Sequence, residues 1–231
     1  MEKLESLKEK LINKLNPLIN KDEQELFNLF YIDSSSKLKN KFNYLITKIL
    51  GYDGVINKST DFINANLELK TIRIEENNII KEHMSFPTFN FFELANSKWK
   101  NSEFRNLFIS KTFLFVVFKK RKNLYYFEKF VFWKMPKEVL ENEIKNTWEL
   151  TSSVIKNGNI IKDFQNGKYI SNFPGSTFNH ICHVRPHDSQ GIDKSGKGAE
   201  LPVPDQLTGL TRYTKHCFWL DRSYILSIIY D

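Results

Sequence analysis

An apolar, β-rich run over residues 112–118 constrains the fold of this chain more than any other segment. Its phenylalanines and valines fit a strand that is covered on both faces. The polar residues 119–123 predict a turn, and residues 124–133 return as an antiparallel partner strand. The sequence therefore predicts a β-sheet in which residues 112–118 form the central strand.

The first fifty residues are predicted to form three helices. Leucines recur at helical spacing over residues 4–15, and a second short helix is expected over residues 22–30. A third helix is indicated by an apolar stripe over residues 38–49, with possible N-caps among residues 33–36 and Gly51 placed as a C-terminal cap. We therefore expect residues 1–51 to be mainly helical.

Strands and turns dominate after this helical segment. Residues 64–74 alternate between two faces, as a strand does, and a turn should lead to a second strand at Ile79. Pro136 opens a further helix that runs to Ile155. Short strands follow, and residues 188–210 form a long loop. With no internal repeat and no linker, the pattern predicts a single α/β domain over residues 1–231.

Net charge, hydropathy and cysteine content indicate which classes of protein this chain can belong to. The net charge of +7 favours an anionic partner such as nucleic acid. No run of about 18 apolar residues suggests a membrane span, and the charged N-terminus does not look like a signal peptide, so a cytoplasmic location is expected. Cys182 and Cys217 are too few for a disulfide framework or a four-cysteine zinc site, which favours two buried thiols.

Chemistry is expected in the segment that contains Asp61, Glu68 and Lys70. Glu68 and Lys70 stand two apart on a predicted strand, so their side chains leave the same face. Asp61 precedes the strand by enough residues to approach them from a neighbouring turn. Adjacent carboxylates repel unless a cation lies between them, and hard oxygen ligands suit Mg²⁺. Asp61 and Glu68 are therefore candidate metal ligands, and Lys70 is placed to orient an attacking water or to offset charge on a phosphorane.

An Asp followed by Glu-x-Lys also arises by chance on solvated strand faces, so longer motifs are needed. The stretch over residues 45–74, with Ile49-Leu-Gly51, Asp61 and Leu67-Glu-Leu-Lys-Thr-Ile72, resembles the active-site region of the MutH family. That family includes the mismatch-repair nicking enzyme and the Sau-type restriction endonucleases that cut at GATC. The resemblance extends to further segments, namely residues 81–86, 92–96, 112–118, the helix around Trp148, residues 181–187 and residues 214–220.

This resemblance implies a PD-(D/E)XK nuclease fold, an α/β architecture with a central mixed sheet flanked by helices. It implies a catalytic sheet and DNA-recognition elements within residues 52–231. It also implies Mg²⁺-dependent phosphodiester cleavage, with catalytic roles for Asp61, Glu68 and Lys70. One departure stands out, because MutH-like enzymes have a further glutamate on the helix before Ile49-Leu-Gly51 and this sequence has Thr47 there.

The segment His183-Val-Arg-Pro-His187 is a candidate DNA contact. Two histidines four apart can bind zinc on a helix, but Pro186 disfavours a helix there. On an extended segment His183, Arg185 and His187 share one face, and Arg185 can grip a phosphate or a guanine edge. The alternative is a structural strand with a surface arginine.

Three further basic residues are candidates for DNA contact. Arg212 and Lys215 precede the aromatic pair Phe218-Trp219, where the alternative is a solvated basic turn over an aromatic core. Arg73 lies just past the Glu68–Lys70 strand and is expected near the DNA backbone. Lysines in the long loop over residues 188–210 could fold onto DNA as it binds.

The resulting hypothesis is a type II restriction endonuclease that hydrolyses double-stranded DNA at a short specific site and leaves a 5′-phosphate and a 3′-hydroxyl. Two alternatives remain open. One is a mismatch-repair-type nicking endonuclease, and the other, favoured by Thr47, is a sequence-specific DNA-binding or effector domain that does not cleave. The protein is expected to act as a monomer or a homodimer, because cutting both strands needs two subunits or one that acts twice.

Overall fold

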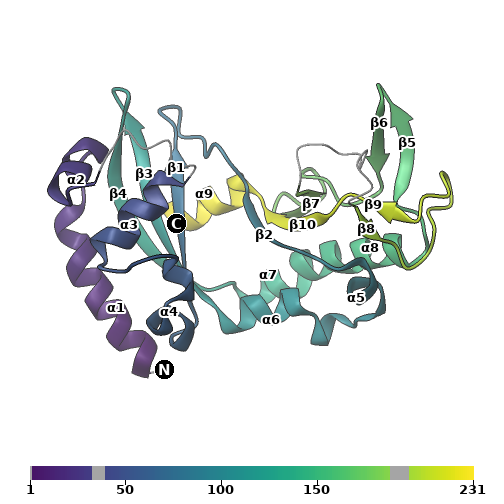
Figure 1. Cartoon of the computed structure of the whole chain (residues 1–231), viewed down its shortest axis with the longest axis horizontal. Helices are drawn as coiled ribbons and strands as arrows, with labels where there is room; N and C mark the ends of the chain where they lie inside the picture. Colours follow the sequence, from purple (N-terminus) through teal and green to yellow (C-terminus); the bar gives the residue numbers. More distant parts are fainter. Residues whose placement is uncertain (1, 33–39, 188–197) are drawn as a thin grey trace. The chain divides into compact units, whose positions relative to one another are not determined.

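The computed structural model describes residues 2–32, 40–187 and 198–231. The chain divides into two compact units, each with its own sheet (Figure 1). The first unit comprises Met1–Glu82 and Phe108–Met135, and the second comprises His83–Leu107 and Pro136–Asp231. The predicted N-caps among residues 33–36 and the first ten residues of the long loop, 188–197, lie outside the described residues. A single domain over the whole chain stays a prediction.

The first unit is built on a mixed three-stranded sheet in the order β1-β3-β4. The central strand β3 (Thr112–Arg121) runs parallel to β1 (Leu67–Ile74) and antiparallel to β4 (Leu124–Trp133). Residues 113–118 are all fully buried, which confirms the predicted central strand. The turn between β3 and β4 is only Lys122-Asn123, and both residues have positive φ, at 49° and 68°. Such a two-residue turn matches the natural twist of the strands that it joins.

The three predicted N-terminal helices are present, as α1 (Glu2–Leu15), α2 (Glu23–Leu29) and α3 (Lys41–Ile49). Helix α2 begins with a complete capping box between Asp22 and Glu25. Leucines of α1 and the apolar stripe of α3 pack with alternate residues of β1 and β3 in one core. This core takes one face of β1, so Glu68 and Lys70, on the alternate positions, point away from it.

The approach to β1 differs from the sequence-based prediction. Residues 60–64 form a short helix, α4 (Thr60–Asn64), where the strand was expected to begin at residue 64. Asn66 then takes a positive φ of 49°, and β1 starts at Leu67. In place of the second strand expected at Ile79, the structure has a single β-bridge between Ile74 and Ile80. The next strand begins only at Met84.

The second unit contains an antiparallel sheet in the order β2-β10-β7. Its central strand is β10 (His216–Leu220), flanked by β2 (Met84–Thr88) and β7 (Cys182–Pro186). A continuous helical segment, which comprises α7 (Lys137–Val139), the π-turn η4 (Leu140–Ile144) and α8 (Lys145–Lys156), follows Pro136 as predicted. The helix ends at Lys156, close to the predicted end at Ile155, and Gly158 follows with a positive φ of 63°.

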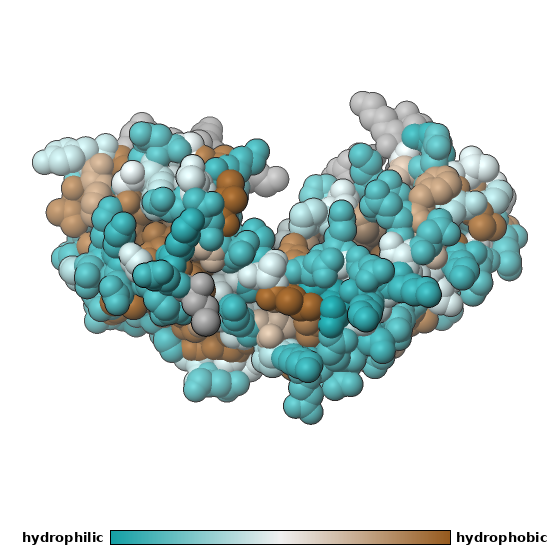
Figure 2. All heavy atoms as spheres, turned by 90° about the horizontal axis from the view of Figure 1, so that it is seen from below, coloured by the Kyte–Doolittle hydropathy of each residue, from teal (hydrophilic) through white to brown (hydrophobic). Residues whose placement is uncertain are grey.

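The other elements are short. They are η1 (Asn16–Leu18), η2 (Ile56–Lys58), α5 (Phe91–Asn96), η3 (Trp99–Asn101), α6 (Glu103–Ser110), β5 (Ile161–Gln165), β6 (Lys168–Ser171), β8 (Ala199–Glu200), β9 (Arg212–Tyr213) and α9 (Arg222–Tyr230). On the face drawn in Figure 2, hydrophilic residues cover most of the surface of both units. None of the described helices has the length and apolar character needed to cross a bilayer.

Candidate active site and nucleic-acid contacts

Strand β1 presents Glu68 and Lys70 on the face opposite the helical core. Leu67 and Leu69 are buried in that core, and the strand alternation turns the two charged side chains to the other side. The Lys70 Nζ lies 2.9 Å from Glu68 Oε1. A carboxylate and an ammonium group are thus held together on a strand whose backbone is fixed by pairing with β3.

Glu68 has a second cationic neighbour that the sequence did not indicate. The Lys111 Nζ lies 3.4 Å from Glu68 Oε2, so each carboxylate oxygen faces a different lysine. Burial disfavours the ionised carboxylate, but Lys70 and Lys111 outweigh it and hold the pKa of Glu68 below its usual value. Glu68 is therefore a charged, partly buried carboxylate at neutral pH, which is the form that a metal ion requires.

Asp61 lies in the first turn of α4, seven residues before Glu68 in the sequence. The Tyr52 hydroxyl donates a hydrogen bond to Asp61 Oδ2 at 2.9 Å. The Tyr52 ring packs edge-on against Phe62, which is fully buried. Burial, followed by the interaction with Asp61, raises the pKa of Tyr52 to about 12, so Tyr52 stays protonated and keeps donating. The convergence of the Asp61 and Glu68 carboxylates on one ion stays a prediction.

The donor set suits a hard divalent cation. Asp61 and Glu68 offer carboxylate oxygens only, and Mg²⁺ is usually held by one or two carboxylates together with waters and substrate phosphates. Lys70 and Lys111 now face the two Glu68 oxygens, so a bound cation would have to displace at least one ammonium group. The carboxylate chemistry of Asp61 and Glu68 fits a magnesium ion that completes its coordination with water and a phosphate.

Thr47 occupies the position where the resemblance implies a further glutamate. It is 2% exposed, and its hydroxyl donates to the Asn43 carbonyl within α3 at 2.7 Å. Its own carbonyl accepts from the Tyr52 amide at 3.0 Å. Thr47 thus provides no carboxylate. Its carbonyl is, however, hydrogen-bonded to Tyr52, whose hydroxyl donates to Asp61.

The segment His183 to His187 is extended, because residues 182–186 form strand β7. His183 is 1% exposed, so in this arrangement its side chain cannot reach a DNA phosphate. Arg185 is half-buried, with Nη2 lying 3.3 Å from His83 Nε2, and His187 is exposed. Within the predicted contact segment, Arg185 and His187 are accessible and His183 is not.

The other predicted contacts have different surroundings. Lys215 is exposed and lines a hollow of the second unit together with Arg212. Arg212 is also paired with Glu200 at 2.9 Å, which offsets its charge. In the first unit, Arg73 is paired with Glu82 at 2.9 Å. Lys215 is therefore the most freely exposed cation among these three.

Four residues that the structure places at candidate sites were not predicted from the sequence. Tyr52 and Lys111 flank the Asp61 and Glu68 carboxylates, and His83 and Asp221 lie beside His183. The sequence gives a weak indication of Lys111, because this residue directly precedes β3, the strand that pairs in parallel with β1. The sequence also gives a weak indication of Asp221, because this residue precedes the apolar run 224–230 at the distance expected of a helix N-cap.

The central mixed sheet flanked by helices, with Glu68 and Lys70 on strand β1 and Asp61 on the helix before it, is consistent with the MutH-like nuclease fold that the motifs implied. Residues 50–147 match the family described as DNA mismatch repair enzyme MutH. The chain is also 29% identical, over 259 aligned residues, to the Type II restriction enzyme Sau3AI of Staphylococcus aureus. That alignment covers 99% of this chain and 52% of the relative, so the chain spans about half of the relative's length. These matches confirm the resemblance to the MutH and Sau-type restriction endonuclease family.

Proposed function

We propose that this protein is a type II restriction endonuclease, which hydrolyses phosphodiester bonds of double-stranded DNA at a short specific site. The observation that carries the proposal is the Glu68 carboxylate between Lys70 and Lys111, within the segment that matches MutH. Charged groups of both signs on a rigid strand are what metal-assisted phosphoryl transfer requires.

Mg²⁺ is the proposed cofactor, with Asp61 and Glu68 as its protein ligands. When bound, it supplies polarisation of the scissile phosphate and lowers the pKa of a bound water. The Tyr52 hydroxyl keeps the Asp61 carboxylate in one orientation by occupying Oδ2. The register of β1 with β3 keeps Glu68 in place.

Lys70 has the role of the catalytic cation. Its ammonium group lies beside Glu68 and can donate a hydrogen bond either to the attacking water or to a phosphate oxygen on which charge develops. Lys111 contacts the other Glu68 oxygen and balances the negative charge of the carboxylate before DNA arrives. Both lysines are therefore expected to support cleavage, and Lys70 more strongly because it lies closer to Glu68.

The second unit supplies the proposed DNA contacts. Lys215 and His187 are exposed, and a backbone hydrogen bond of 2.9 Å between the His187 amide and the Lys215 carbonyl holds the two residues together. Arg185 now contacts His83, and Arg212 is paired with Glu200. Arg73 of the first unit is paired with Glu82. DNA phosphates can replace each of these partners. These side chains supply positive charge for the phosphate backbone, and Arg185 has the chemistry to read a guanine edge.

A DNA-binding domain without cleavage is the second candidate function. It is favoured by Thr47, which removes a carboxylate from the site, and by the match to only about half of the relative. A nicking endonuclease is the third. Either a monomer or a homodimer fits the proposal, and a cytoplasmic location remains a prediction.

Incubation with supercoiled plasmid distinguishes the three functions. The proposed enzyme converts the plasmid to discrete linear fragments when Mg²⁺ is present and leaves it intact when the ion is chelated. A nicking enzyme produces only open circles. A binding domain retards the DNA in a gel without cutting it, and that result would refute the proposal.

A further inference from the structure

Three potential metal ligands meet at one end of the sheet in the second unit. Leu220 of β10 pairs with Met84 of β2 on one side and with Cys182 of β7 on the other. His83 directly precedes Met84, His183 directly follows Cys182, and Asp221 directly follows Leu220. The sheet register therefore brings together two imidazoles and a carboxylate from three segments that are distant in sequence.

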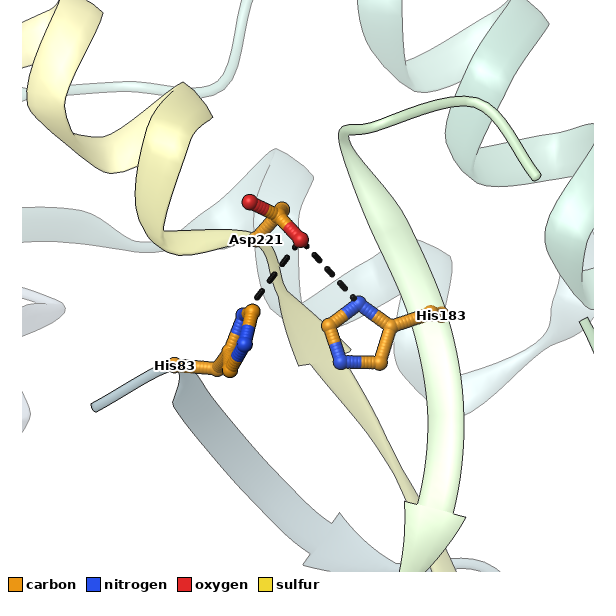
Figure 3. A group of neighbouring side chains, drawn as sticks. All are labelled: His83, His183 and Asp221. Carbon is orange, nitrogen blue, oxygen red and sulfur yellow. Dashed lines mark ion pairs between the residues drawn. The ribbon is translucent and has the colours of Figure 1, made fainter. Parts of the chain in front are cut away.

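The three side chains point toward one another (Figure 3). Asp221 Oδ2 lies 3.4 Å from His83 Nδ1 and 3.8 Å from His183 Nδ1. One potential ligand atom from each residue lies within 4.8 Å of the other two. The other Asp221 oxygen, Oδ1, accepts hydrogen bonds from the Ser223 amide and hydroxyl at 2.9 and 2.7 Å. The carboxylate is thus fixed with Oδ2 turned to the imidazoles.

His183 is difficult to explain without a ligand. It is 1% exposed, and neither ring nitrogen has a hydrogen-bond partner. Leaving such buried polar groups unsatisfied costs about 1–3 kcal/mol each, so an unsatisfied group in a folded protein calls for an explanation such as a bound ion. Burial, followed by the charge of Arg185, lowers the pKa of His183 to about 4. His183 is therefore neutral at physiological pH, and neutral imidazole is the metal-binding form.

We propose that His83, His183 and Asp221 bind one divalent transition-metal ion of the Zn²⁺ class. Ligand atoms about 2.0 to 2.1 Å from a tetrahedral zinc lie about 3.3 Å from one another. The distances of 3.4 and 3.8 Å from Asp221 Oδ2 need only a small contraction to reach that value. The group has three members among the described residues, which leaves a fourth position for water.

The chemistry of this site differs from that of the Asp61 and Glu68 site. Imidazole nitrogen suits borderline ions such as Zn²⁺, whereas Mg²⁺ prefers an all-oxygen shell. The chain therefore has two separate places for divalent ions, one for a hard ion in the first unit and one for a softer ion in the second. This inference stands whether or not the protein cleaves DNA.

The ion would cross-link the strand ends of the sheet that carries Arg185. Its ligands lie at the ends of β2, β7 and β10, which otherwise depend on backbone pairing at this edge. Coordination through His83 Nδ1 would replace the hydrogen bond that this nitrogen now accepts from the Arg222 amide at 3.2 Å.

The test is metal titration of the full chain after all ions have been removed with a chelator. Zn²⁺ is titrated by calorimetry in the presence of excess Mg²⁺, which occupies the oxygen site, and Co²⁺ is added separately as a spectroscopic probe. Two ligand variants are compared, His83→Gln and His183→Gln. His187→Gln is the matched control, because it removes an exposed histidine of the same segment. Glu68→Gln controls for binding at the other site.

We expect one equivalent of Zn²⁺ to bind to the wild type, to His187→Gln and to Glu68→Gln. We expect Co²⁺ to give the visible absorption of four-coordinate cobalt. Loss of a direct ligand should weaken binding by more than about 100-fold, since even outer partners of metal ligands contribute factors of about 10 to 100. Zn²⁺ should also raise the melting temperature of the wild type and of His187→Gln but not that of His83→Gln.

Two results would overturn the proposal. One is a wild type that binds no Zn²⁺ under these conditions. The other is Zn²⁺ binding by His83→Gln with unchanged affinity. If the buried His183→Gln variant does not fold, His83→Gln still decides the question, because His83 is the more exposed of the two histidines.

Discussion

The Tyr52 hydroxyl donates a hydrogen bond to Asp61 Oδ2, and the Tyr52 amide donates to the Thr47 carbonyl. The end of α3 is thereby connected to the carboxylate on α4. The resemblance to the MutH family implies a glutamate at the position of Thr47, and here the same helix is linked to Asp61 through the hydrogen bonds of Tyr52. Tyr52 is therefore a positioning residue for the proposed metal ligand.

Replacing Tyr52 tests this connection. Tyr52→Phe keeps the ring packed on Phe62 but removes the donor to Asp61. We expect the Mg²⁺ concentration for half-maximal cleavage to rise by about 10- to 100-fold, with a smaller change in the maximal rate. Tyr44→Phe is the matched control on the exposed side of α3 and should leave that concentration unchanged. A Tyr52→Phe protein with wild-type Mg²⁺ dependence would remove the positioning role.

The two lysines at Glu68 are predicted to differ in importance. Lys70→Ala should lower the single-turnover cleavage rate by roughly 100- to 1000-fold, as loss of one transition-state donor does. Lys111→Ala should cause a smaller loss, because Lys111 lies 3.4 Å from Glu68 rather than 2.9 Å. Gel-shift affinity for DNA without divalent ions should stay within a few-fold in both. Equal losses of cleavage would mean that Lys70 has no special role.

Arg185 and Lys215 are predicted to contact DNA in different ways. If Arg185 reads a base, Arg185→Ala should weaken specific binding by about 1–3 kcal/mol and relax the preference at one position. If Lys215 contacts only phosphate, Lys215→Ala should weaken all sequences alike and reduce the salt dependence by about one unit. Binding isotherms at several salt concentrations separate the two effects. Unchanged affinity in both variants would place the recognition surface elsewhere.

The stability of the second unit should depend on pH through His216. Burial lowers the pKa of His216 from 6.5 to about 4. The unfolded chain therefore takes up a proton more readily, so this contribution to stability is complete above about pH 6.5 and is lost as the pH falls toward about 4.

Denaturant midpoints measured over this range should fall for the wild type and fall less for His216→Phe, which keeps a ring stacked on Tyr213. Some acid sensitivity will remain in the variant because His183 titrates in the same direction. An identical pH dependence in both proteins would show that His216 is not buried in its neutral form.

Local patterns explain which elements could be predicted from the sequence. The β3–β4 hairpin and the helices α1, α3 and α8 each carry their own apolar periodicity and end signals, which do not depend on distant residues. Helix α4 lacks such a pattern, because it has five residues and depends on the Ser59 cap and on the positive φ of Asn66. Asp61, Glu68 and Lys70 could be proposed as a site from the sequence because they lie close together within a longer stretch that resembles the MutH active-site region.

The partners of those residues depend on tertiary structure. Lys111 reaches Glu68 only through the parallel pairing of β1 with β3. His83 and Asp221 reach His183 only through the pairing of β2 and β7 with β10. Pairings between segments so far apart in sequence leave no periodic signal in any one of them. The burial of His183 could not be predicted from the sequence for the same reason.

Asp61 and Glu68 are proposed to form the metal-dependent cleavage site, and paired cleavage and binding assays of Asp61→Ala and Glu68→Ala test this most directly. Each variant is incubated with plasmid and Mg²⁺, and its DNA affinity is measured separately without divalent ions. We predict that both lose cleavage while binding DNA with nearly wild-type affinity, because the ligands act on the scissile phosphate and not on recognition. Cleavage by either variant at the wild-type rate would contradict the account.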